Sequence, residues 1–375
     1  MRGRDGRGLC PTGHNGAVST SSNWVAHRRD PAWVAPPPDP AALAFHRQLA
    51  GYAATRLVEL PELAGELAVG RVFAKDESRR LGLPAFKALG ASWAVRRALD
   101  RTDGPERVTI VTATDGNHGR AVARAAVQFG QHATVLVPRG VHPDAIAAIR
   151  AEGADVVQVD GSYDDAVARA ADLGRHAGHV LVQDTAWDGY EEVPGWIVDG
   201  YATLFVEIDE QLAAGGVGHP DLVVVPTGVG SLLQAALVQY RQHEQAPTSV
   251  VSAEPGNAAC VYASIAAGRR VTVPTGVTAM AGLNCGTVST VAWPVIAGGL
   301  DAALVTDDAS AARAAETLEQ LGVDAGPCGA APLAALRAVA GTKAFRDHVG
   351  IDGASVVVLL VTEGSAANPG RAPST

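Results

Sequence analysis

The sequence predicts an α/β fold built from two doubly wound, mostly parallel sheet domains with a cleft between them. Over residues 107–185, runs of β-branched residues alternate with alanine-rich amphipathic segments, and a second set of such units extends from residue 221 to residue 364. Strands and helices that alternate at this spacing form parallel sheets with helices on both faces. Such sheets bind ligands at the carboxyl ends of their strands, which here would face the cleft.

The first set of units follows an entry segment at residues 38–74, which contains a short helix and leads into a strand over residues 71–77. A helix that contains Lys87 comes next. The remaining strands of this set are expected at residues 107–114, 132–138, 154–160 and 179–185, and its helices at residues 120–129, 143–152 and 163–174.

The second set follows a long helical stretch at residues 190–212. Its strands are expected at residues 221–227, 249–255 and 354–364. We expect residues 1–33 to be a disordered leader or an overlong start, because their composition cannot form a core and they lack the apolar segment of a signal peptide. The rest divides into a large domain, residues 34–89 and 187–369, and a small α/β domain inserted at residues 90–186.

Composition and charge exclude several classes of protein. The net charge of −9 argues against binding to nucleic acids or anionic membrane surfaces, since both need clustered positive charge. No apolar run approaches the roughly 20 residues of a membrane span. The cysteines, Cys10, Cys260, Cys285 and Cys328, form no CxxC pair and have no histidines at metal-ligand spacing, which argues against a metal site. We therefore expect reduced thiols in a cytoplasmic protein.

Lys87 is the first candidate for chemistry. The chain has only three lysines, Lys75, Lys87 and Lys343, against 27 arginines (30 basic residues minus 3). A lysine in such a sequence is a candidate for a task that a guanidinium cannot perform, such as forming a Schiff base with an aldehyde cofactor. Pro84 precedes a good helix former, so Lys87 falls in the first helical turn, where the helix dipole favours a neutral, nucleophilic amine. The alternative is a solvated surface lysine.

Two glycine-containing turns follow strands. TDGNHG places Asp115, Asn117 and His118 before a helix whose first N–H groups can bind a carboxylate or phenolate, although it could also be an ordinary turn with an N-cap aspartate. TGVGS places Gly228 and Gly230 where backbone N–H groups can hold a phosphate without a basic side chain. It is neither a Walker motif, which needs GKS/T, nor a dinucleotide GxGxxG, which belongs at the first turn of its domain.

Four motifs in this order, AFKALGAS, TDGNHG, PTGVGS and VTEGS, resemble the fold type II pyridoxal-phosphate enzymes, which include threonine dehydratase, threonine synthase and the tryptophan synthase β chain. The longer stretches KDESRRLGLPAFKALGASWA, TATDGNHGRAVA, VQDTAWDGYEEVPGWIVDGY and MAGLNCGTVS are similar to those of diaminopropionate ammonia-lyase. The similarity covers residues 45–364. It implies pyridoxal 5′-phosphate in the cleft between the two domains, and a homodimer.

The resemblance assigns roles to residues that match the family's motifs. Lys87 would be the Schiff-base lysine, Asn117 would bond the 3′-oxygen of the cofactor, and Thr362 would face its pyridine nitrogen. A neutral hydroxyl there cannot hold the ring as a full pyridinium, which favours elimination over transamination; the alternative for Thr362 is a strand-end hydroxyl satisfied by its own loop. The implied cofactor-binding residues are Phe86, Lys87, Asn117, Gly228, Val229, Gly230, Ser231 and Thr362.

The resemblance also implies catalytic and substrate-binding residues. Asp115 and Asp184 match the two acids that the lyase family uses as bases on opposite isomers of the substrate, and they join Lys87 as the catalytic set. In the dehydratases the first of these positions is usually a serine. The alternative is that Asp115 is a helix N-cap and Asp184 a structural partner of an arginine. The implied substrate-binding residues are Thr114, Gly116 and His118.

The chain departs from the family pattern at Asp324 and Ala325, where glutamate and serine are expected, and this concerns the substrate side of the site. The family also carries cysteines near the positions of Cys260 and Cys285. A bridge between these two is therefore an alternative to the reduced thiols expected in the cytoplasm.

The implied function is β-elimination of ammonia from L- and D-2,3-diaminopropionate, giving pyruvate and ammonia, with a small amino acid as the partner. One alternative is a serine or threonine dehydratase or a β-replacement synthase. The other is a non-catalytic α/β ligand-binding protein, which would show no visible absorbance from a lysine-bound cofactor.

Overall fold

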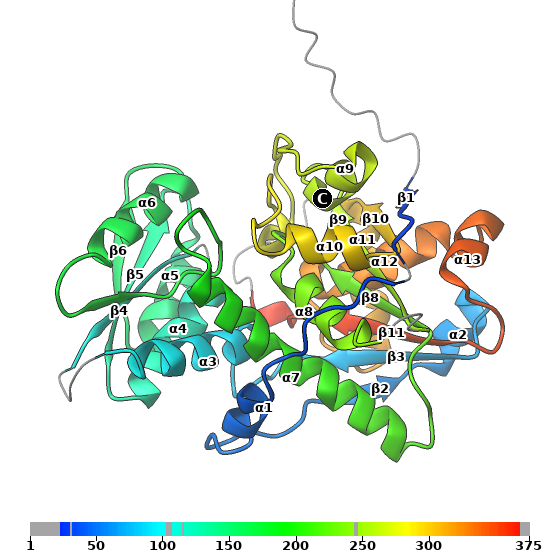
Figure 1. The fold of residues 1–375 in the computed structure, drawn as a ribbon, viewed down its shortest axis with the longest axis horizontal. Coiled ribbons are helices and arrows are strands. Elements are labelled where there is room, and N and C mark those ends of the chain that lie inside the picture. The colour runs from blue at the N-terminus through cyan, green and yellow to red at the C-terminus, as the bar shows by residue number, and fades with distance from the viewer. Residues whose placement is uncertain (1–22, 31, 103–106, 115, 244–246, 368–375) are drawn as a thin grey trace, which may run out of the picture.

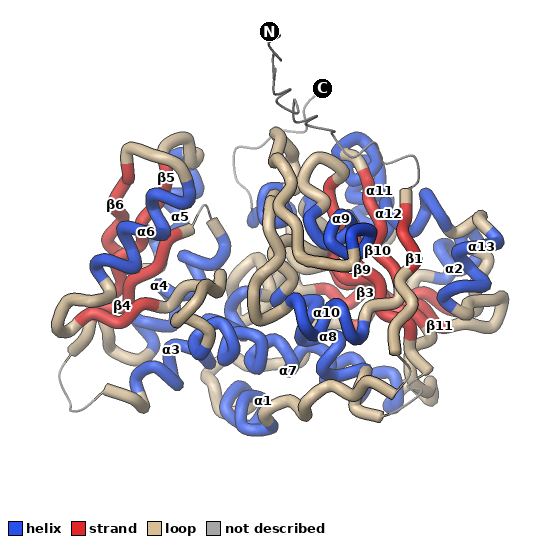
Figure 2. The backbone as a smooth tube through the Cα atoms, turned by 45° about the horizontal axis from the view of Figure 1, so that its top comes forward, coloured by secondary structure: helices blue, strands red, loops and turns tan. Residues whose placement is uncertain are grey.

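The computed structural model describes residues 23–30, 32–102, 107–114, 116–243 and 247–367. They form a large and a small sheet that lie on opposite sides of the molecule, with the long helix α7 running between them (Figure 1, Figure 2). The large sheet has the strand order β1 (Trp24–Ala26), β10 (Ala302–Thr306), β9 (Ser249–Pro255), β8 (Leu222–Pro226), β11 (Val356–Val361), β3 (Arg71–Asp76) and β2 (Leu57–Glu59). The small sheet has the order β6 (Asp155–Val159), β5 (His132–Pro138), β4 (Thr109–Ala113) and β7 (His179–Leu181).

Both sheets are parallel in their interiors. All neighbouring strands of the small sheet are parallel, and in the described part of the large sheet the edge strands β1 and β2 run antiparallel to their neighbours. The prediction of two doubly wound, mostly parallel sheets is therefore confirmed. The four strands of the small sheet all fall within the predicted inserted domain, while the exact domain boundaries stay a prediction.

Helices cover both sheets and connect the strands. They are α1 (Pro40–His46), α2 (Pro61–Leu67), α3 (Lys87–Leu99), α4 (Asn117–Gln128), α5 (Pro143–Ala151), α6 (Tyr163–Leu173), α7 (Glu192–Ala214), α8 (Ser231–Tyr240), α9 (Cys260–Ala267), α10 (Trp293–Gly299), α11 (Asp308–Gln320), α12 (Pro327–Val339) and α13 (Lys343–Val349). Over the ranges that the structure describes, none of these helices combines the length and the apolar character needed to cross a membrane.

The central strands of the large sheet are apolar on both faces, as expected for strands covered by helices on each side. In β8 every residue is buried. Val223 and Val225 pack into the core that includes α7 and α8, whereas Leu222 and Val224 pack into the core that includes α11 and α12. The run LVVVP therefore contributes side chains to two hydrophobic cores. Its lack of alternation between apolar and polar residues identifies it as an interior strand.

Part of the predicted leader is wrong. Trp24–Ala26 form the edge strand β1 and pair with β10. The ring centroids of Trp24 and Phe345 are 5.4 Å apart in an edge-to-face arrangement. An aromatic residue that packs on the core outweighs the polar composition around it. Residues 1–22, which include Cys10, lie outside the described residues.

The helices α3 and α7 cross at a pair of glycines. A Cβ atom on Gly90 would lie 2.5 Å from the ring of Tyr201, and one on Gly200 would lie 2.7 Å from Leu89 O. Because neither position has room for a side chain, the two helix backbones approach closely here. This crossing fixes the start of α3, which carries Lys87, against the middle of α7.

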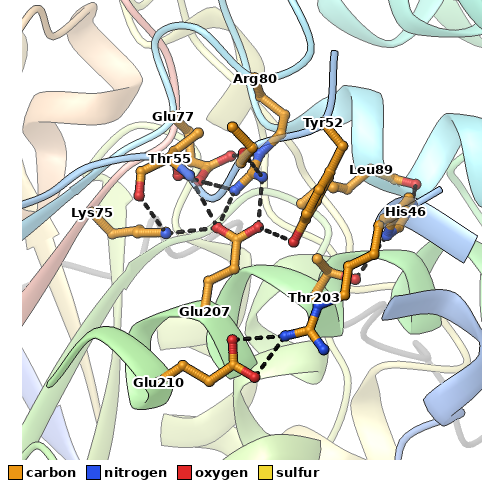
Figure 3. A network of polar contacts seen from close by, with 12 residues as sticks. His46, Tyr52, Thr55, Lys75, Glu77, Arg80, Leu89, Thr203, Glu207 and Glu210 are labelled. Atoms are coloured by element: carbon orange, nitrogen blue, oxygen red, sulfur yellow. Dashed lines mark hydrogen bonds and ion pairs between the residues drawn. The ribbon is translucent and has the colours of Figure 1, made fainter. Parts of the chain in front are cut away.

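A buried network of charges fixes α7 against the segment that leads to α3 (Figure 3). Glu207 of α7 accepts hydrogen bonds from Arg80 Nη1 (2.7 Å) and from Lys75 Nζ (2.7 Å), and Arg80 also donates to Glu77 (2.6 Å). All four side chains are at most 1% exposed. Burial alone would raise the pKa of Glu207, but Arg80 and Lys75 hold it below its usual range.

We expect Glu207→Ala to lower the free energy of unfolding by about 3–5 kcal/mol, because it leaves two buried cations without their shared carboxylate. Urea denaturation of the two proteins measures this difference. The matched control is Glu210→Ala, one turn along the same helix, which removes an exposed pair with Arg47 (2.7 Å) and should cost less than about 1 kcal/mol. Equal losses in the two variants would contradict a stabilising role for the network.

The network also decides between the lysines. Lys75 is fully buried and donates to Glu207, to Thr55 O and to Gln211. Lys343 is the first residue of α13, and its side chain is 86% exposed. Neither lies where a ligand between the two sheets could be reached.

Candidate active site

Lys87 begins α3 directly after a loop that is bound to the end of β11. The N–H of Phe86 donates to Thr362 O (3.0 Å), and the N–H of Gly364 donates to Pro84 O (3.0 Å). The prediction that Lys87 lies in the first turn of its helix is confirmed. These bonds place its side chain at the carboxyl end of the large sheet.

Asp184 reaches Lys87 from the small sheet, where it follows β7. Its Oδ2 atom accepts a hydrogen bond from Lys87 Nζ at 2.8 Å. Burial by itself would lower the pKa of Lys87, but the charge of Asp184 outweighs it and raises that pKa well above its ordinary value. Burial would likewise raise the pKa of Asp184, but the electrostatic influence of His118 and the charge and hydrogen bond of Lys87 hold it at about 2.

The expectation that the helix dipole favours a neutral amine at Lys87 is therefore wrong. The helix dipole contributes a partial positive charge that salt screens easily. Asp184, in contrast, contributes a full negative charge within hydrogen-bond distance of Lys87. The carboxylate decides the direction of the shift, so Lys87 is an ammonium that forms an ion pair with Asp184.

His118, in the first turn of α4, lies behind Asp184. Its ring is 4% exposed, its Nε2 atom is 3.1 Å from Val182 O, and its Nδ1 atom is 3.7 Å from Asp184 Oδ2. Burial lowers the pKa of His118. Because a carbonyl oxygen only accepts, the neutral ring donates through Nε2 and directs the lone pair of Nδ1 toward Asp184.

Tyr201 is a site residue that the sequence did not indicate. It lies on α7, its ring centroid is 4.7 Å from that of Phe86 and 5.8 Å from Lys87 Nζ, and burial raises its pKa to about 12. Its hydroxyl is buried and has no hydrogen-bond partner within the described residues. Tyr201 is the last residue of the stretch VQDTAWDGYEEVPGWIVDGY. No role was inferred for it, because only the glycine crossing of α3 and α7 brings it to the site.

Asn117 connects the small domain to the large one. It is the first residue of α4, and its Nδ2 atom donates to Glu363 Oε2 at 2.9 Å. The Oδ1 atom is buried and finds no partner among the residues described. Glu363, which follows Thr362, stands in the VTEGS motif, but its role was not inferred from the sequence.

The TGVGS turn lies between β8 and the start of α8. Gly230 has φ +102°, a conformation that favours glycine, and a Cβ atom there would lie 2.7 Å from Ile296. The N–H of Ser289 donates to Val229 O (2.8 Å), but in the described part of the chain no hydrogen bond takes up the N–H groups of Gly228, Val229 or Gly230. With Ser231 at the helix start, these free N–H groups could accept an anion.

Two other predicted residues, Thr114 and Thr362, each lie directly after a strand. Thr114 follows β4, and its Oγ1 atom accepts from Gly116 N (3.0 Å). Thr362 is buried directly after β11. Asp115 lies outside the described residues. The structure thus brings Lys87, Asp184 and His118 together. It places Asn117 against Glu363, at the end of β11, with TGVGS at the end of the neighbouring strand β8.

The described cysteines are reduced. Cys260, Cys285 and Cys328 form no disulfide, and the thiol of Cys260 donates to Gly228 O at 3.5 Å. Burial raises the pKa of Cys260. Within the described ranges no group of three or more His, Cys, Asp or Glu side chains could hold a metal ion.

Comparisons with known proteins agree with this geometry. The family of pyridoxal-phosphate dependent enzymes matches residues 49–363. A diaminopropionate ammonia-lyase of Salmonella typhimurium is 37% identical over 355 residues, which cover 86% of this chain and 88% of that protein. The crystal structure of diaminopropionate ammonia-lyase from Escherichia coli in complex with an aminoacrylate-PLP azomethine reaction intermediate superimposes with a TM-score of 0.83 and 32% identity, over 92% of this chain and 94% of that one. The same enzyme in complex with D-serine gives a TM-score of 0.83 and 31% identity over the same shares.

Proposed function

Because this chain belongs to the pyridoxal-phosphate dependent enzymes and, among them, to the diaminopropionate ammonia-lyases, we propose that it eliminates ammonia from 2,3-diaminopropionate and yields pyruvate and a second ammonia. The observation that carries the proposal is the pair of Lys87 Nζ and Asp184 Oδ2, 2.8 Å apart between the two sheets. Such an elimination requires two groups, a nucleophilic amine and a carboxylate that can accept a proton.

The residues at the site fit pyridoxal 5′-phosphate. The free N–H groups of Gly228 to Ser231 suit its phosphate, and the amide of Asn117 suits its 3′-oxygen. The buried Asn117 Oδ1 and Tyr201 hydroxyl lack partners among the described residues, which marks a polar environment for a ligand. When bound at this site, the cofactor would supply an electron sink for the carbanion that loss of the substrate's α-proton leaves.

The ion pair with Lys87 also controls the basicity of Asp184. The positive charge of Lys87 is one reason for the low pKa of Asp184. When Lys87 is in a neutral form, this positive charge is lost. The pKa of Asp184 then rises, so its carboxylate is a stronger base when substrate is present. Asp184 then receives the α-proton. We propose the same proton-accepting role for Asp115 on the opposite isomer.

An assay of the 2-oxo acid released from separate amino acids tests the function, with pyruvate expected from diaminopropionate and serine and 2-oxobutyrate from threonine. We expect turnover of L- and D-2,3-diaminopropionate, and values of kcat/KM for serine and threonine that are lower by at least about tenfold, since a protonated amine and a hydroxyl leave through different contacts. A preference for serine or threonine would indicate a dehydratase, and a product that retains an added nucleophile would indicate a β-replacement synthase. A non-catalytic ligand-binding protein would release no pyruvate from any of them.

We expect Gly230→Asp to weaken cofactor binding by at least about a hundredfold. The substitution places a carboxylate beside the phosphate, a repulsion of several kcal/mol at low dielectric, at a position where φ is +102° and a Cβ atom has no room. Equilibrium dialysis measures the affinity. Gly230→Ala separates strain from charge, because it carries the same backbone cost without the carboxylate. Unchanged affinity in Gly230→Asp would show that this turn does not hold the phosphate.

We also propose that the protein works as a cytoplasmic homodimer in amino-acid catabolism. Homodimers are the common state among enzymes of this fold, and light scattering on the purified holoenzyme would give its mass. A monomer that retains full activity would reject the dimer as a requirement.

A further inference from the structure

A buried carboxylate that the proposed chemistry does not use lies beside Asn117. Glu363 is 3% exposed and follows Thr362 at the carboxyl end of β11. Burying a carboxylate is costly unless donors surround it. The donors that the structure gives to Glu363 therefore indicate what this position requires.

Glu363 is held firmly by the large domain. Its Oε1 atom accepts from the N–H of Cys328 (3.2 Å) in the first turn of α12, and its carbonyl accepts from the N–H of Gly326 (2.9 Å). Cβ atoms on Gly326 and Gly329 would lie 3.0 Å from Oε1 and 2.7 Å from the carbonyl oxygen. Two glycines are thus needed for α12 to approach this residue, and the position of the carboxylate is fixed.

The other oxygen faces the small domain. Oε2 accepts from Asn117 Nδ2 at 2.9 Å. A carboxylate has acceptors only, whereas an amide has two N–H donors on one side and an oxygen on the other. Glu363 therefore selects the amide orientation in which Asn117 presents nitrogen, since the flipped amide would set two oxygens against each other.

We propose that Glu363 is a positioning residue that orients Asn117 for the cofactor. It binds one N–H of the amide and leaves the second N–H free to donate to the 3′-oxygen, which needs a donor. The inference rests on the proposed function, because it takes Asn117 as the ligand of that oxygen. The hydrogen bond also joins α4 to the end of β11, so it sets the distance between Asn117 and the phosphate-binding turn.

The test is a double-mutant cycle on the cofactor dissociation constant, measured by equilibrium dialysis. A glutamine has a single side-chain oxygen and cannot accept from both the Cys328 N–H and Asn117. Glu363→Gln should therefore weaken binding by about tenfold in the wild-type background, as expected for a lost hydrogen bond to a charged group. In the Asn117→Ala background the same substitution should change the affinity by less than about twofold, because the group through which Glu363 acts is absent.

A matched control removes a carboxylate that contacts the opposite end of β11. Asp221 accepts from Val356 N–H at 2.7 Å, and Asp221→Asn should leave cofactor affinity unchanged. Equal effects of Glu363→Gln in both backgrounds would overturn the proposal and make Glu363 a helix cap only. As a second variant, Asn117→Asp should bind cofactor more weakly than Asn117→Ala because it opposes two carboxylates, and the reverse order would also overturn it.

The outcomes separate this inference from the proposed function. A wild-type protein without visible absorbance after incubation with cofactor would refute the proposed function. A wild-type protein with normal absorbance, together with unchanged affinity in Glu363→Gln, would refute the positioning role alone.

Discussion

Replacing Lys87 by alanine should abolish the visible absorption of bound cofactor and reduce pyruvate release to the uncatalysed background. Lys87 is the single lysine of the chain that reaches the site, since Lys75 is buried in the Glu207 network and Lys343 is exposed on α13. No other amine can therefore replace it in covalent bonding to an aldehyde. An absorption spectrum and a pyruvate assay on the purified variant measure both effects.

Two further variants separate charge from nucleophilicity. Lys87→Arg keeps a cation next to Asp184 but cannot be deprotonated, so it should remain folded and be as inactive as Lys87→Ala. Lys343→Ala changes an exposed helix residue and should retain the absorbance and the activity. A visible cofactor band that persists in Lys87→Ala would mean that the lysine assignment is incorrect. Lys75 is a poor control, because substituting it would disturb the buried network.

The sequence predicts most interior strands of the two sheets, but it missed β10, although every residue of its run AALVT is buried. The strands β5 and β9 were predicted residue for residue, because turn residues bound their apolar runs. The run at 179–185 was predicted as one strand, but β7 ends at Leu181. The N–H of Gln183 donates to the hydroxyl of Tyr190 (2.9 Å) and not to a neighbouring strand. Because the chain leaves the sheet here, Asp184 can face Lys87. Hydrophobic patterning cannot detect where a ladder ends for such a reason.

The candidate site was predictable to the extent that its residues stand in motifs. Lys87, Asn117, Asp184 and the TGVGS turn were identified in this way. Tyr201 and Glu363 were missed, because their roles depend on the crossing of α3 with α7 and on the approach of α12 to β11. The direction of the pKa shift at Lys87 was wrong for the same reason: the helix dipole is local in sequence, but the opposing charge comes from the small sheet.

Substituting Asp184 by asparagine should lower turnover of L-2,3-diaminopropionate by about a hundredfold or more and largely spare the D isomer. The α-protons of the two isomers point to opposite faces of the cofactor, so one fixed base cannot serve both. Asp184 follows β7, which pairs in parallel with β4, and Thr114 and Gly116 follow β4 on each side of Asp115 in the sequence. By the family resemblance, we expect Asp184 to serve the L isomer and Asp115 the D isomer. Turnover of each isomer alone measures the effect.

The reciprocal variant makes the assignment sharp. Asp115→Asn should lose D activity and keep L activity, so the ratio of the two turnovers moves in opposite directions in the two variants. Loss of the ion pair with Lys87 in Asp184→Asn also lowers the pKa of that amine, but this effect is common to both isomers and cancels in the ratio. Equal losses on both isomers in both variants would reject the division of roles. Full activity of either variant on both isomers would instead remove that aspartate from the proton transfer and leave it a structural residue.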